Sequence, residues 1–479
     1  MKKNFTIAFI HFFLVNFVVA QDIVSVNHLG SYTQAQIQAS IPVPLIGLDF
    51  GVDAYKVNYN TTDPFGNNTV ASGVLYIPSG CDNFPLISYQ HGTILEKENV
   101  ASRNPEDVGL LAAAFGFACT AADFLGMGDN SGTHPYIHSE SEATASIDLM
   151  RAARDFMTDT LTYTLNGQVY LLGYSQGGHA TMAVHKYVED NNLLAEFDIK
   201  GSSPLSGPYD LVGVQMDMIL DSSYTSPAYI AYIADSYQYV YGNLYNSPSD
   251  YYKSPYDVTI PPLLDGTHTL FELNTALPNN IFLFMEDSVM QNVIADSLTN
   301  LHPLRAALVR NSNYDWLPTR PIRMAYCDGD EQVNYMNSLK AKSTMIANGA
   351  TDVDAIHILP GATHGDCALP AILNAVNWFL TTATICTPWT TNALNVDFNQ
   401  SVRVFPNPAN DILNIQLDDN LSNQDLMIEI LDLNGRVLKQ SNLTQTSNTQ
   451  LSLTELSQGM YLIRVYNGQV NVWKKVVVK

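Results

Sequence analysis

The chain has few basic residues and twice as many acidic ones. Its 479 residues include 23 Lys and Arg against 46 Asp and Glu, which gives a formal net charge of −23. Proteins that bind nucleic acids neutralise phosphates chiefly with Lys and Arg, so this charge argues against a nucleic-acid-binding protein. Hydrophobic residues make up 46 % of the chain, enough for a large core, which excludes an intrinsically disordered protein.

Long hydrophobic runs are also scarce, and the longest lies at the N-terminus. Two lysines precede the apolar range Phe5–Val19, and the small residue Ala20 follows it. This pattern predicts a secretory signal peptide over residues 1–20. About fifteen apolar residues fall short of a bilayer span, so we favour a signal peptide over a membrane anchor. We therefore expect an exported protein with no integral membrane segment, in a compartment where disulfides persist.

Charge is distributed unevenly along the chain. Residues 401–479 hold seven basic and seven acidic residues and no Cys or His, whereas residues 21–400 hold 14 basic and 39 acidic residues. Such a step in composition predicts two folding units. We expect a large domain at 21–383 and a small domain at 401–479, joined by a linker at 384–400 that follows a Thr-rich run.

The tail is predicted to be all-β. Alternating polar and apolar runs are separated by Asn434-Gly435, Gln458-Gly459 and Asn467-Gly468. Period-two patterns with such turns indicate hairpins, and several of them in a short stretch indicate a small sandwich. The runs are Ile428–Leu433, Tyr461–Tyr466 and Val472–Val478.

Four separated motifs follow one another along this tail. They are F-P-N-P-A-N-D-I-L-N-I from Phe405, D-L-N-G-R-V-L from Asp432, L-S-Q-G-M-Y-L-I-R-V from Leu456, and the final K-K-V-V-V-K. Together they resemble the type A C-terminal sorting domain of the type IX secretion system. The resemblance implies export through the periplasm and outer membrane by that machinery, usually with removal of the domain, and a secreted or cell-surface protein. A generic carbohydrate-binding sandwich is the alternative, although Trp473 is the one tryptophan of the tail.

The large domain is predicted to alternate strands and helices. Apolar residues recur every three to four positions over 145–156 and 180–188, which indicates helices between apolar strands. Such alternation is typical of an α/β fold, with a mostly parallel sheet covered on both faces. Active sites of such sheets lie at the carboxyl ends of the strands. The expected strands are Tyr55–Tyr59, Gly73–Ile77, Leu86–Gln90, Ala118–Ala122, Val169–Gly173, Lys200–Leu205, Ile322–Cys327 and Ala355–Leu359.

One of these strands runs into the motif Gly173-Tyr174-Ser175-Gln176-Gly177. A serine in G-x-S-x-G between a strand and a helix sits on a tight turn, which needs small residues at both glycines and exposes the hydroxyl. The same letters also arise in ordinary Gly-rich turns, but the strand before and the helix after supply the required context. Ser175 is therefore the candidate nucleophile.

A serine nucleophile needs a base and an orienting acid. Asp328 and Asp330 follow one expected strand end, and His364 follows another. The chain order serine, acid, histidine is the one expected of α/β-hydrolases. We favour Asp330 over Asp328 because the apolar Val333 downstream can anchor the loop.

Four other histidines compete with His364. His357 falls inside an expected strand, where a packed or surface role is expected. His179 opens the helix after the nucleophile, where we expect a structural hydrogen bond. His302 and His268 are the remaining competitors.

Ester chemistry also needs donors for the oxyanion that develops on the carbonyl. The strand ending at Gln90 continues into His91-Gly92-Thr93, the position from which α/β-hydrolases supply one backbone N–H. The residue after the nucleophile supplies the other. We assign the amides of Thr93 and Gln176, with an ordinary strand-ending turn as the alternative for His91-Gly92.

Seven motifs are spread in order over most of residues 50–380. They are Q-H-G-T (90–93), A-D-F-L-G-M-G-D (122–129), H-P-Y (134–136), S-E-A-T-A-S-I-D-L-M-R-A-A-R (141–154), G-Y-S-Q-G-G-H-A (173–180), G-P-Y-D-L (207–211) and G-A-T-H-G-D (361–366). Together they resemble the secretory lipase branch of the α/β-hydrolases, with the thinnest similarity from about 215 to 315. The resemblance implies a lipase or carboxylesterase with the triad Ser175, Asp330 and His364, and a substrate-selecting cap at about 212–315.

The expected cap is rich in tyrosine. Ten of the 26 tyrosines lie between Tyr224 and Tyr256. Gathered above the nucleophile, the rings would form an apolar wall that still hydrogen-bonds, suited to aryl, acyl or sugar-linked esters. The alternative is that they pack only on each other. A long lid helix of Leu and Phe is missing from the sequence, which favours an esterase over an interfacially activated lipase.

The five cysteines cannot all pair within one molecule. Cys327 and Cys367 both follow strand ends on the expected catalytic face, and Cys81 and Cys386 are expected on the opposite face. We therefore expect the disulfides Cys327–Cys367 and Cys81–Cys386, which require Cα atoms within about 7 Å. Cys119 falls inside an expected strand and is predicted to be a buried free thiol.

No metal site or cofactor is predicted. His138, Glu140 and Glu142 are of ligand type, but their spacing matches no metal motif, and Asp123 and Asp129 flank a turn. The sequence thus predicts an exported serine hydrolase that cleaves carboxylic esters of small molecules, lipids or carbohydrates. Two alternatives stay open: a serine peptidase of the same fold acting on short peptides, and a non-catalytic surface adhesin that retains the hydrolase shell.

Overall fold

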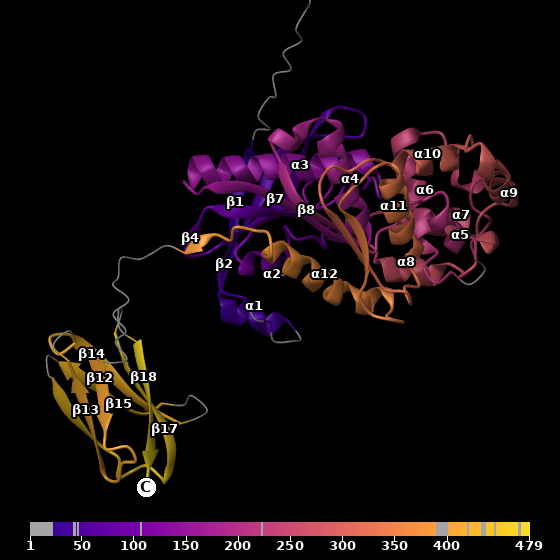
Figure 1. Cartoon of the computed structure of the whole chain (residues 1–479). Coiled ribbons are helices and arrows are strands. Elements are labelled where there is room, and N and C mark those ends of the chain that lie inside the picture. Colours follow the sequence, from indigo (N-terminus) through magenta and orange to yellow (C-terminus); the bar gives the residue numbers. More distant parts are fainter. Residues whose placement is uncertain are drawn as a thin grey trace, which may run out of the picture. The chain divides into compact units, whose positions relative to one another are not determined.

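The computed structural model describes residues 23–41, 45, 47–105, 108–221, 224–388, 401–418, 421–432, 437–444, 447–467 and 471–479. The expected signal peptide, and most of the expected linker, lie outside these ranges. The chain divides into two units, Met1–Trp389 and Thr390–Lys479, each of which has its own sheets and core (Figure 1). Among the described residues, no helix is long and apolar enough to span a bilayer.

A nine-stranded sheet forms the centre of the first unit. Its order is β1-β2-β3-β6-β5-β7-β8-β9-β10. The pairs from β1 to β6 are antiparallel and those from β6 to β10 are parallel. All eight expected strands are present, and β1 adds an antiparallel edge. The strands are β1 (Ile23–Tyr32), β2 (Val52–Thr62), β3 (Asn68–Pro78), β5 (Phe84–Gln90), β6 (Ala118–Ala122), β7 (Leu165–Tyr174), β8 (Asp198–Leu205), β9 (Ile322–Tyr326) and β10 (Val353–His357).

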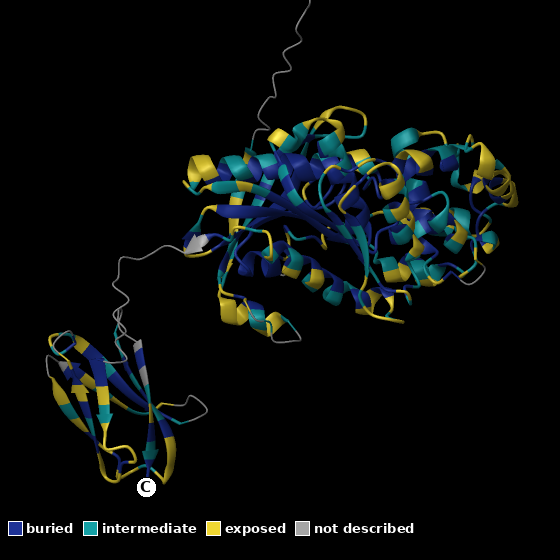
Figure 2. Ribbon diagram, in the orientation of Figure 1, coloured by how far each residue is buried: buried dark blue, intermediate teal, exposed yellow. Residues whose placement is uncertain are grey.

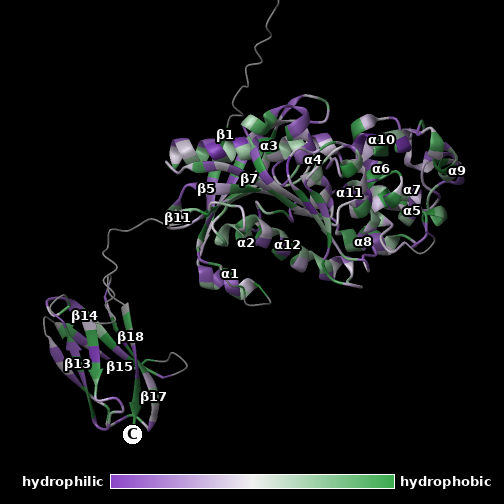
Figure 3. Cartoon of the chain, viewed as in Figure 1, coloured by the Kyte–Doolittle hydropathy of each residue, from purple (hydrophilic) through white to green (hydrophobic). Residues whose placement is uncertain are grey.

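Helices cover both faces of this sheet (Figure 1). Its central strands are buried, with β5 enclosed along its whole length (Figure 2), and they are rich in hydrophobic residues (Figure 3). Helices α3 and α4 pack on one face through residues such as Leu149 and Val184. Helices α2 and α12 pack on the other through Leu110 and Phe379. The α/β architecture expected from the sequence is therefore confirmed. The helices are α1 (Gln34–Ser40), α2 (Val108–Ala114), α3 (Ser139–Asp155), α4 (Gln176–Asp190), α11 (Met336–Ala347) and α12 (His364–Leu380).

The chain between β8 and β9 folds into a helical cap with a hydrophobic core of its own. Tyr237, Tyr252 and Phe284 are fully buried in this core. Its helices are α5 (Val214–Ile219), α6 (Ala228–Tyr241), α7 (Tyr256–Leu263), α8 (Leu270–Ala276), α9 (Asp287–Ala295) and α10 (Pro303–Asn311). Short helical turns lie at Phe156–Thr160, Leu193–Ala195, Pro248–Asp250, Ile281–Leu283 and Asp296–Leu298.

Two disulfides join distant segments of the first unit. The Cα atoms of Cys327 and Cys367 are 6.0 Å apart, and this bond connects the end of β9 to α12. The Cα atoms of Cys81 and Cys386 are 5.7 Å apart. Both expected pairs are present, and Cys119 is a buried cysteine of β6 that belongs to neither disulfide.

Residues 384–388 differ from the expectation that a linker begins at 384. Strand β11 (Thr387–Pro388) pairs antiparallel with β4 (Cys81–Asp82), directly beside the Cys81–Cys386 disulfide. The Thr384 N–H also donates to Gln168 Oε1 at 2.7 Å. A covalent bond and a short ladder therefore hold these five residues to the first unit, which the Thr-rich composition of the segment did not reveal.

The second unit is a sandwich of two antiparallel sheets, ordered β12-β13-β16 and β15-β14-β17-β18. Alternate residues such as Leu413, Ile428 and Ile463 face a shared core. The expected all-β tail is thus confirmed, while the turn residues Asn434-Gly435 lie outside the described part of the chain. The strands are β12 (Val402–Phe405), β13 (Ile412–Leu417), β14 (Asp425–Leu431), β15 (Val437–Thr444), β16 (Asn448–Ser452), β17 (Gly459–Tyr466) and β18 (Asn471–Val478).

Candidate active site

Ser175 stands on the tight turn between β7 and α4. Its backbone has φ 62° and ψ −120°, a sparsely populated conformation that costs free energy for any residue with a side chain. The surrounding hydrogen bonds hold it there, because the Ser175 N–H donates to the Leu205 carbonyl at 2.9 Å and its carbonyl accepts from the His179 N–H at 3.1 Å. This geometry is typical of a nucleophile lifted above the sheet.

The glycines around Ser175 are required by close backbone approach. A Cβ atom at Gly173 would lie 2.2 Å from the Gly177 carbonyl oxygen, and one at Gly177 would lie 2.0 Å from the Gln90 carbonyl oxygen. Both contacts are with backbone, which cannot move aside cheaply. The G-x-S-x-G pattern is therefore the consequence of packing the turn against β5.

His364 opens α12 and pairs with Asp330. The His364 Nδ1 atom is 2.7 Å from Asp330 Oδ2. The other carboxylate oxygen of Asp330 accepts from the N–H groups of Gln332, at 3.0 Å, and Val333, at 2.9 Å. Three hydrogen bonds thus fix the acid, and one of them occupies Nδ1 of His364.

The competing acid and histidines lie elsewhere. Asp328 and His357 are exposed and pair with each other, with His357 Nε2 3.1 Å from Asp328 Oδ1. His179 is buried inside α4, and His268 and His302 belong to the cap. Of the five candidate histidines, His364 is the one that lines a cavity together with Ser175.

Two contacts that the sequence did not reveal fix the backbone of His364. The Glu331 Oε2 atom accepts from the His364 N–H at 3.0 Å, and the Tyr174 hydroxyl donates to its carbonyl at 2.7 Å. Burial acts to raise the pKa of Glu331, but hydrogen bonds, first that from the His364 N–H, lower it overall. Burial raises the pKa of Tyr174, so its hydroxyl stays a donor. Their sequence positions next to Asp330 and Ser175 were the one available signal.

Ser175 and His364 line the same cavity, whose volume is about 480 Å³. Thr93 lies on its wall after β5. Gln176 is the first residue of α4, so its N–H belongs to the helix turn that has no intrahelical acceptor. Both expected oxyanion residues therefore flank the nucleophile. The remaining wall is formed by Tyr89, His91, Gly92, Ile94, Asn99, Val100, Ala101, Asn104, Tyr174, Tyr229, Gly365 and Ala368.

One cap tyrosine lines the cavity and others pack on each other, which are the two roles that the sequence left open. Tyr229 lines the cavity and donates to Gln332 Oε1 at 2.6 Å, above the loop that carries Asp330. Tyr251 and Tyr252 pack against each other, with ring centroids 5.4 Å apart, in the cap core.

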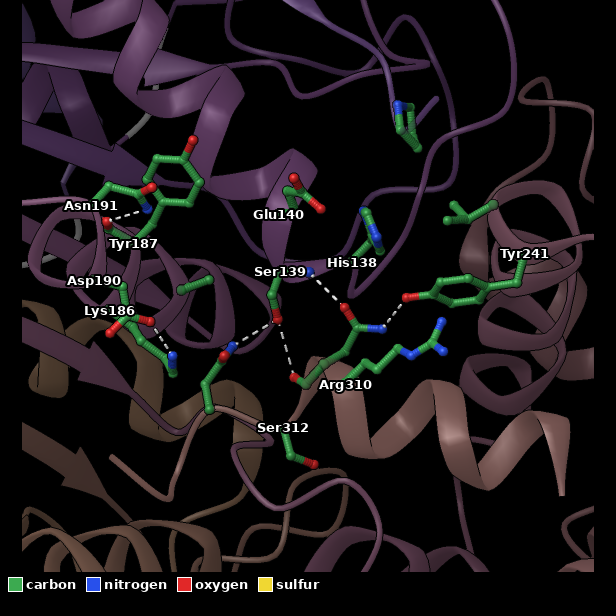
Figure 4. A pocket seen from close by; sticks show the side chains of 15 residues that line it. His138, Ser139, Glu140, Lys186, Tyr187, Asp190, Asn191, Tyr241, Arg310 and Ser312 are labelled. Carbon is green, nitrogen blue, oxygen red and sulfur yellow. Dashed lines mark hydrogen bonds and ion pairs between the residues drawn. The ribbon is translucent and has the colours of Figure 1, made fainter. Parts of the chain in front are cut away.

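A second cavity of about 420 Å³ lies where α3 and α4 meet the cap helices α6 and α10 (Figure 4). His138 and Glu140 line it, together with Ser139 and Asn311. The Ser139 N–H donates to Asn311 Oδ1 at 2.9 Å. His138 itself caps α3 by accepting from the Ser141 N–H. These side chains serve the junction between the sheet domain and the cap.

The remaining acids considered as ligands also have structural partners. Glu142 is buried, where its carboxylate accepts from the Gln176 amide at 3.0 Å and faces His179 Nδ1 at 2.7 Å. Asp123 accepts from the Ser72 hydroxyl at 2.5 Å. Asp129 forms ion pairs with Lys56 and Arg103.

Comparison with known proteins identifies the tail. Residues 403–479 match the family described as the secretion system C-terminal sorting domain. This match supports the interpretation of the tail as a sorting domain and argues against a generic carbohydrate-binding sandwich. No curated protein matches the chain.

The first unit is similar to solved hydrolase structures. A rice cell wall degrading esterase, LipA from Xanthomonas oryzae, is 28 % identical over 75 % of this chain and 97 % of its own, with a TM-score of 0.68. A putative hydrolase from Legionella pneumophila is 27 % identical over 75 % of this chain and 97 % of its own, with a TM-score of 0.69. Candida antarctica lipase A shares the fold at 15 % identity, 76 % and 84 % coverage, and a TM-score of 0.56. The chain is thus an α/β-hydrolase-fold protein, similar to LipA-like esterases and lipases, that ends in a type IX sorting domain for export to the cell surface or the medium.

Proposed function

We propose that this protein hydrolyses carboxylic esters through an acyl-enzyme formed on Ser175. One observation carries the proposal: His364, whose Nδ1 atom lies 2.7 Å from the buried acid Asp330, lines one cavity with a serine held on a strained turn. A nucleophile, a base and an orienter of the base are the minimum set for this chemistry.

In the acylation step the Ser175 Oγ atom attacks the ester carbonyl while His364 Nε2 takes its proton. Asp330 occupies His364 Nδ1, so it sets the tautomer that leaves Nε2 free as a base and stabilises the imidazolium that forms. The backbone N–H groups of Thr93 and Gln176 bind the oxyanion. Loss of one such donor typically lowers the rate by about 10²–10³-fold.

The tetrahedral intermediate then collapses, and the bond to the leaving alcohol breaks as His364 returns the proton to it. Water attacks the acyl-enzyme by the same route, with His364 as base and then as acid, and the carboxylic acid leaves. Ser175 regains its proton. No cofactor takes part in these steps.

The cavity wall supports esters of moderate size with a polar or aromatic part. Its volume of about 480 Å³ falls within the range of pockets that bind one small molecule. Asn99, Asn104 and Tyr229 supply polar groups beside apolar Val100 and Ala101. We therefore expect short acyl esters, including acylated sugars and aryl esters, to be cleaved faster than long-chain triglycerides.

The test is hydrolysis of p-nitrophenyl esters of increasing chain length by the wild type and the Ser175→Ala variant. We expect activity that falls with chain length and is abolished in the variant. A fluorophosphonate should label the wild type and leave Ser175→Ala unlabelled. Absence of labelling in both proteins would favour a non-catalytic adhesin, and faster cleavage of aminoacyl-arylamides than of esters would favour a peptidase.

A further inference from the structure

The segment His134-Pro135-Tyr136 touches both residues of the proposed oxyanion hole. The Tyr136 hydroxyl lies 2.9 Å from Thr93 Oγ1, and the Gln176 side-chain amide donates to His134 Nε2 at 2.9 Å. Thr93 lies 43 residues before Tyr136 in the sequence, and Gln176 lies 42 residues after His134. One tripeptide therefore links the two loops that supply the oxyanion donors.

His134 is fixed in the state that this contact requires. Burial lowers its pKa to about 4, so the imidazole is neutral at neutral pH. Its Nδ1–H donates to the Leu125 carbonyl at 2.7 Å, which leaves Nε2 as an acceptor for the Gln176 amide. The second hydrogen of that amide goes to Glu142 Oε1 at 3.0 Å. Both amide hydrogens are thus used to fix the first residue of α4.

Cap helix α6 holds the same tripeptide. The Tyr136 ring stacks on the Tyr232 ring, with centroids 4.3 Å apart and planes 6° apart. The Tyr136 N–H donates to Ser236 Oγ at 2.9 Å, and the Ser236 hydroxyl donates to the His134 carbonyl at 2.7 Å. Tyr136 is buried, so its position is set by α6 rather than by solvent.

Helix α6 also reaches the loop that carries Thr93. The Tyr232 hydroxyl donates to the carbonyl of Ile94, the residue after Thr93, at 3.2 Å. At the other end of the helix, the Tyr241 hydroxyl accepts from Asn311 Nδ2 at 2.9 Å, and Asn311 Oδ1 accepts from the Ser139 N–H (Figure 4). The cap is therefore tied to the chain on both sides of the tripeptide.

We propose that Tyr136 is a positioning residue of the oxyanion hole, which holds the Thr93 loop through the Thr93 hydroxyl and is itself held by α6. This inference rests on the proposed function and adds that the cap takes part in transition-state stabilisation. The charge that Thr93 binds exists only in the transition state, so a loosened loop affects turnover more than ground-state binding. Misplacement of a catalytic group by about 1 Å can cost on the order of 10²-fold in rate.

The first test is the Tyr136→Phe variant, which removes the hydroxyl and keeps the stacked ring. On a p-nitrophenyl ester we expect kcat to fall about 10-fold or more, with KM changed by less than about 2-fold. Affinity for a trifluoromethyl ketone, which forms an oxyanion on Ser175, should fall by the same factor as kcat/KM. Wild-type kcat and wild-type affinity for the ketone would overturn the proposal.

A matched control and a second pair of variants separate positioning from folding. The control is Tyr251→Phe, which, like Tyr136→Phe, removes a buried tyrosine hydroxyl. Tyr251 lies in the cap, and no hydrogen-bond partner for its hydroxyl is found among the described residues. This variant should keep wild-type kinetics. Thr93→Val removes the hydroxyl that Tyr136 contacts and should lose as much activity as Tyr136→Phe. The Tyr136→Phe, Thr93→Val double variant should lose no more than either single variant. Losses that multiply would show that Tyr136 does not act through Thr93.

Fluorophosphonate labelling in the same preparations distinguishes failure of the positioning role of Tyr136 from failure of the proposed ester hydrolase. If Ser175 is labelled and Ser175→Ala is inactive while Tyr136→Phe and Thr93→Val keep full activity, the positioning role is wrong and the ester hydrolase stands. If Ser175→Ala keeps activity, the proposed function fails, and the role of Tyr136 fails with it.

Discussion

Asp328 and Asp330 show how two like residues in one loop differ through their partners. Asp330 is buried, accepts two backbone N–H groups and holds His364, whereas Asp328 is exposed and pairs with His357. The Asp330→Asn variant should therefore lower kcat by about 10³–10⁴-fold, because an amide no longer stabilises the imidazolium or sets its tautomer. The measurement is kcat and kcat/KM on one p-nitrophenyl ester.

Asp328→Asn is the matched control for this prediction. It changes the same atoms two residues away, at a position where one exposed histidine and the Gly361 N–H are the partners. Activity should stay within about 3-fold of wild type, because exposed pairs contribute little. A loss in Asp328→Asn as large as that in Asp330→Asn would contradict the assignment of the acid.

At the scale of elements, helix α6 carries an acid, Asp235, that the fold partly withdraws from solvent. Burial raises the pKa of Asp235 to about 6, above its value of about 3.9 in the unfolded chain. The protonated carboxyl therefore favours folding below pH 4, and this contribution is lost as the pH rises to about 6. Asp235→Asn should raise the free energy of unfolding at pH 7 by up to about 3 kcal/mol.

The comparison of urea midpoints at pH 4 and pH 7 checks this sign. The stability gain of Asp235→Asn should be present at pH 7 and absent at pH 4. Asp217→Asn, which changes an exposed acid of α5, should shift neither midpoint. Equal gains at both pH values would mean that the effect does not come from titration of Asp235.

The two disulfides stabilise different parts of the first unit. Cys327–Cys367 joins the strand before Asp330 to the helix that begins at His364, and its two cysteines are 40 residues apart in sequence. Cys81–Cys386 closes a much longer loop, since its cysteines are 305 residues apart. Each bond should contribute about 2–5 kcal/mol to folding. Replacing Cys327 and Cys367 by Ser should also lower kcat/KM, because the acid and the base lose their covalent connection.

Replacement of Cys81 and Cys386 by Ser provides the contrast. That variant should melt earlier yet keep wild-type kcat/KM well below its melting temperature, because the Cys81–Cys386 bond joins neither the strand before Asp330 nor the helix that begins at His364. Equal kinetic losses in both double variants would show that loss of stability alone explains them.

The elements that could be predicted from the sequence are those with strong local patterns. Strands β5 and β7 read as apolar runs, and the turn at Ser175 reads as glycines at fixed positions. Strand β1 was missed because its pattern is broken: its register against β2 shifts between Ile23 and Ser25 and between His28 and Gly30. Strands β4 and β11 are two residues each, too short for any period.

The sequence could predict those candidate site residues that directly follow strands, because active sites of parallel sheets lie at the carboxyl ends of the strands. Ser175, Asp330 and His364 each follow a strand of the parallel sheet, so residue type and position together pointed to them. The contacts of Glu331 with the His364 N–H and of Tyr136 with Thr93 were not predictable, since they depend on how loops and the cap meet in space. The motif H-P-Y was visible, but its role was not.

At the scale of the whole molecule, the chain combines two units with different charge and different tasks. The catalytic unit carries the excess acid, and the sorting domain that directs export is neutral. The structure places residues 384–388 with the catalytic unit, through Cys386 and β11. The position of a cut between the units should therefore decide whether the catalytic unit stays stable.

Two truncated proteins test this division. A protein ending at Trp389 keeps Cys386, β11 and the Thr384 hydrogen bond to Gln168, so it should match the full chain in kcat/KM. A protein ending at Ala383 loses all three, and its free energy of unfolding should fall by about 2–5 kcal/mol, because the 305-residue loop is no longer closed. Both should remain inside cells that export the full chain, since each lacks the sorting domain. Thermal unfolding, ester hydrolysis and cell fractionation are the measurements. A protein ending at Trp389 that melts as early as the one ending at Ala383 would mean that the catalytic unit depends on residues beyond 389 for its stability.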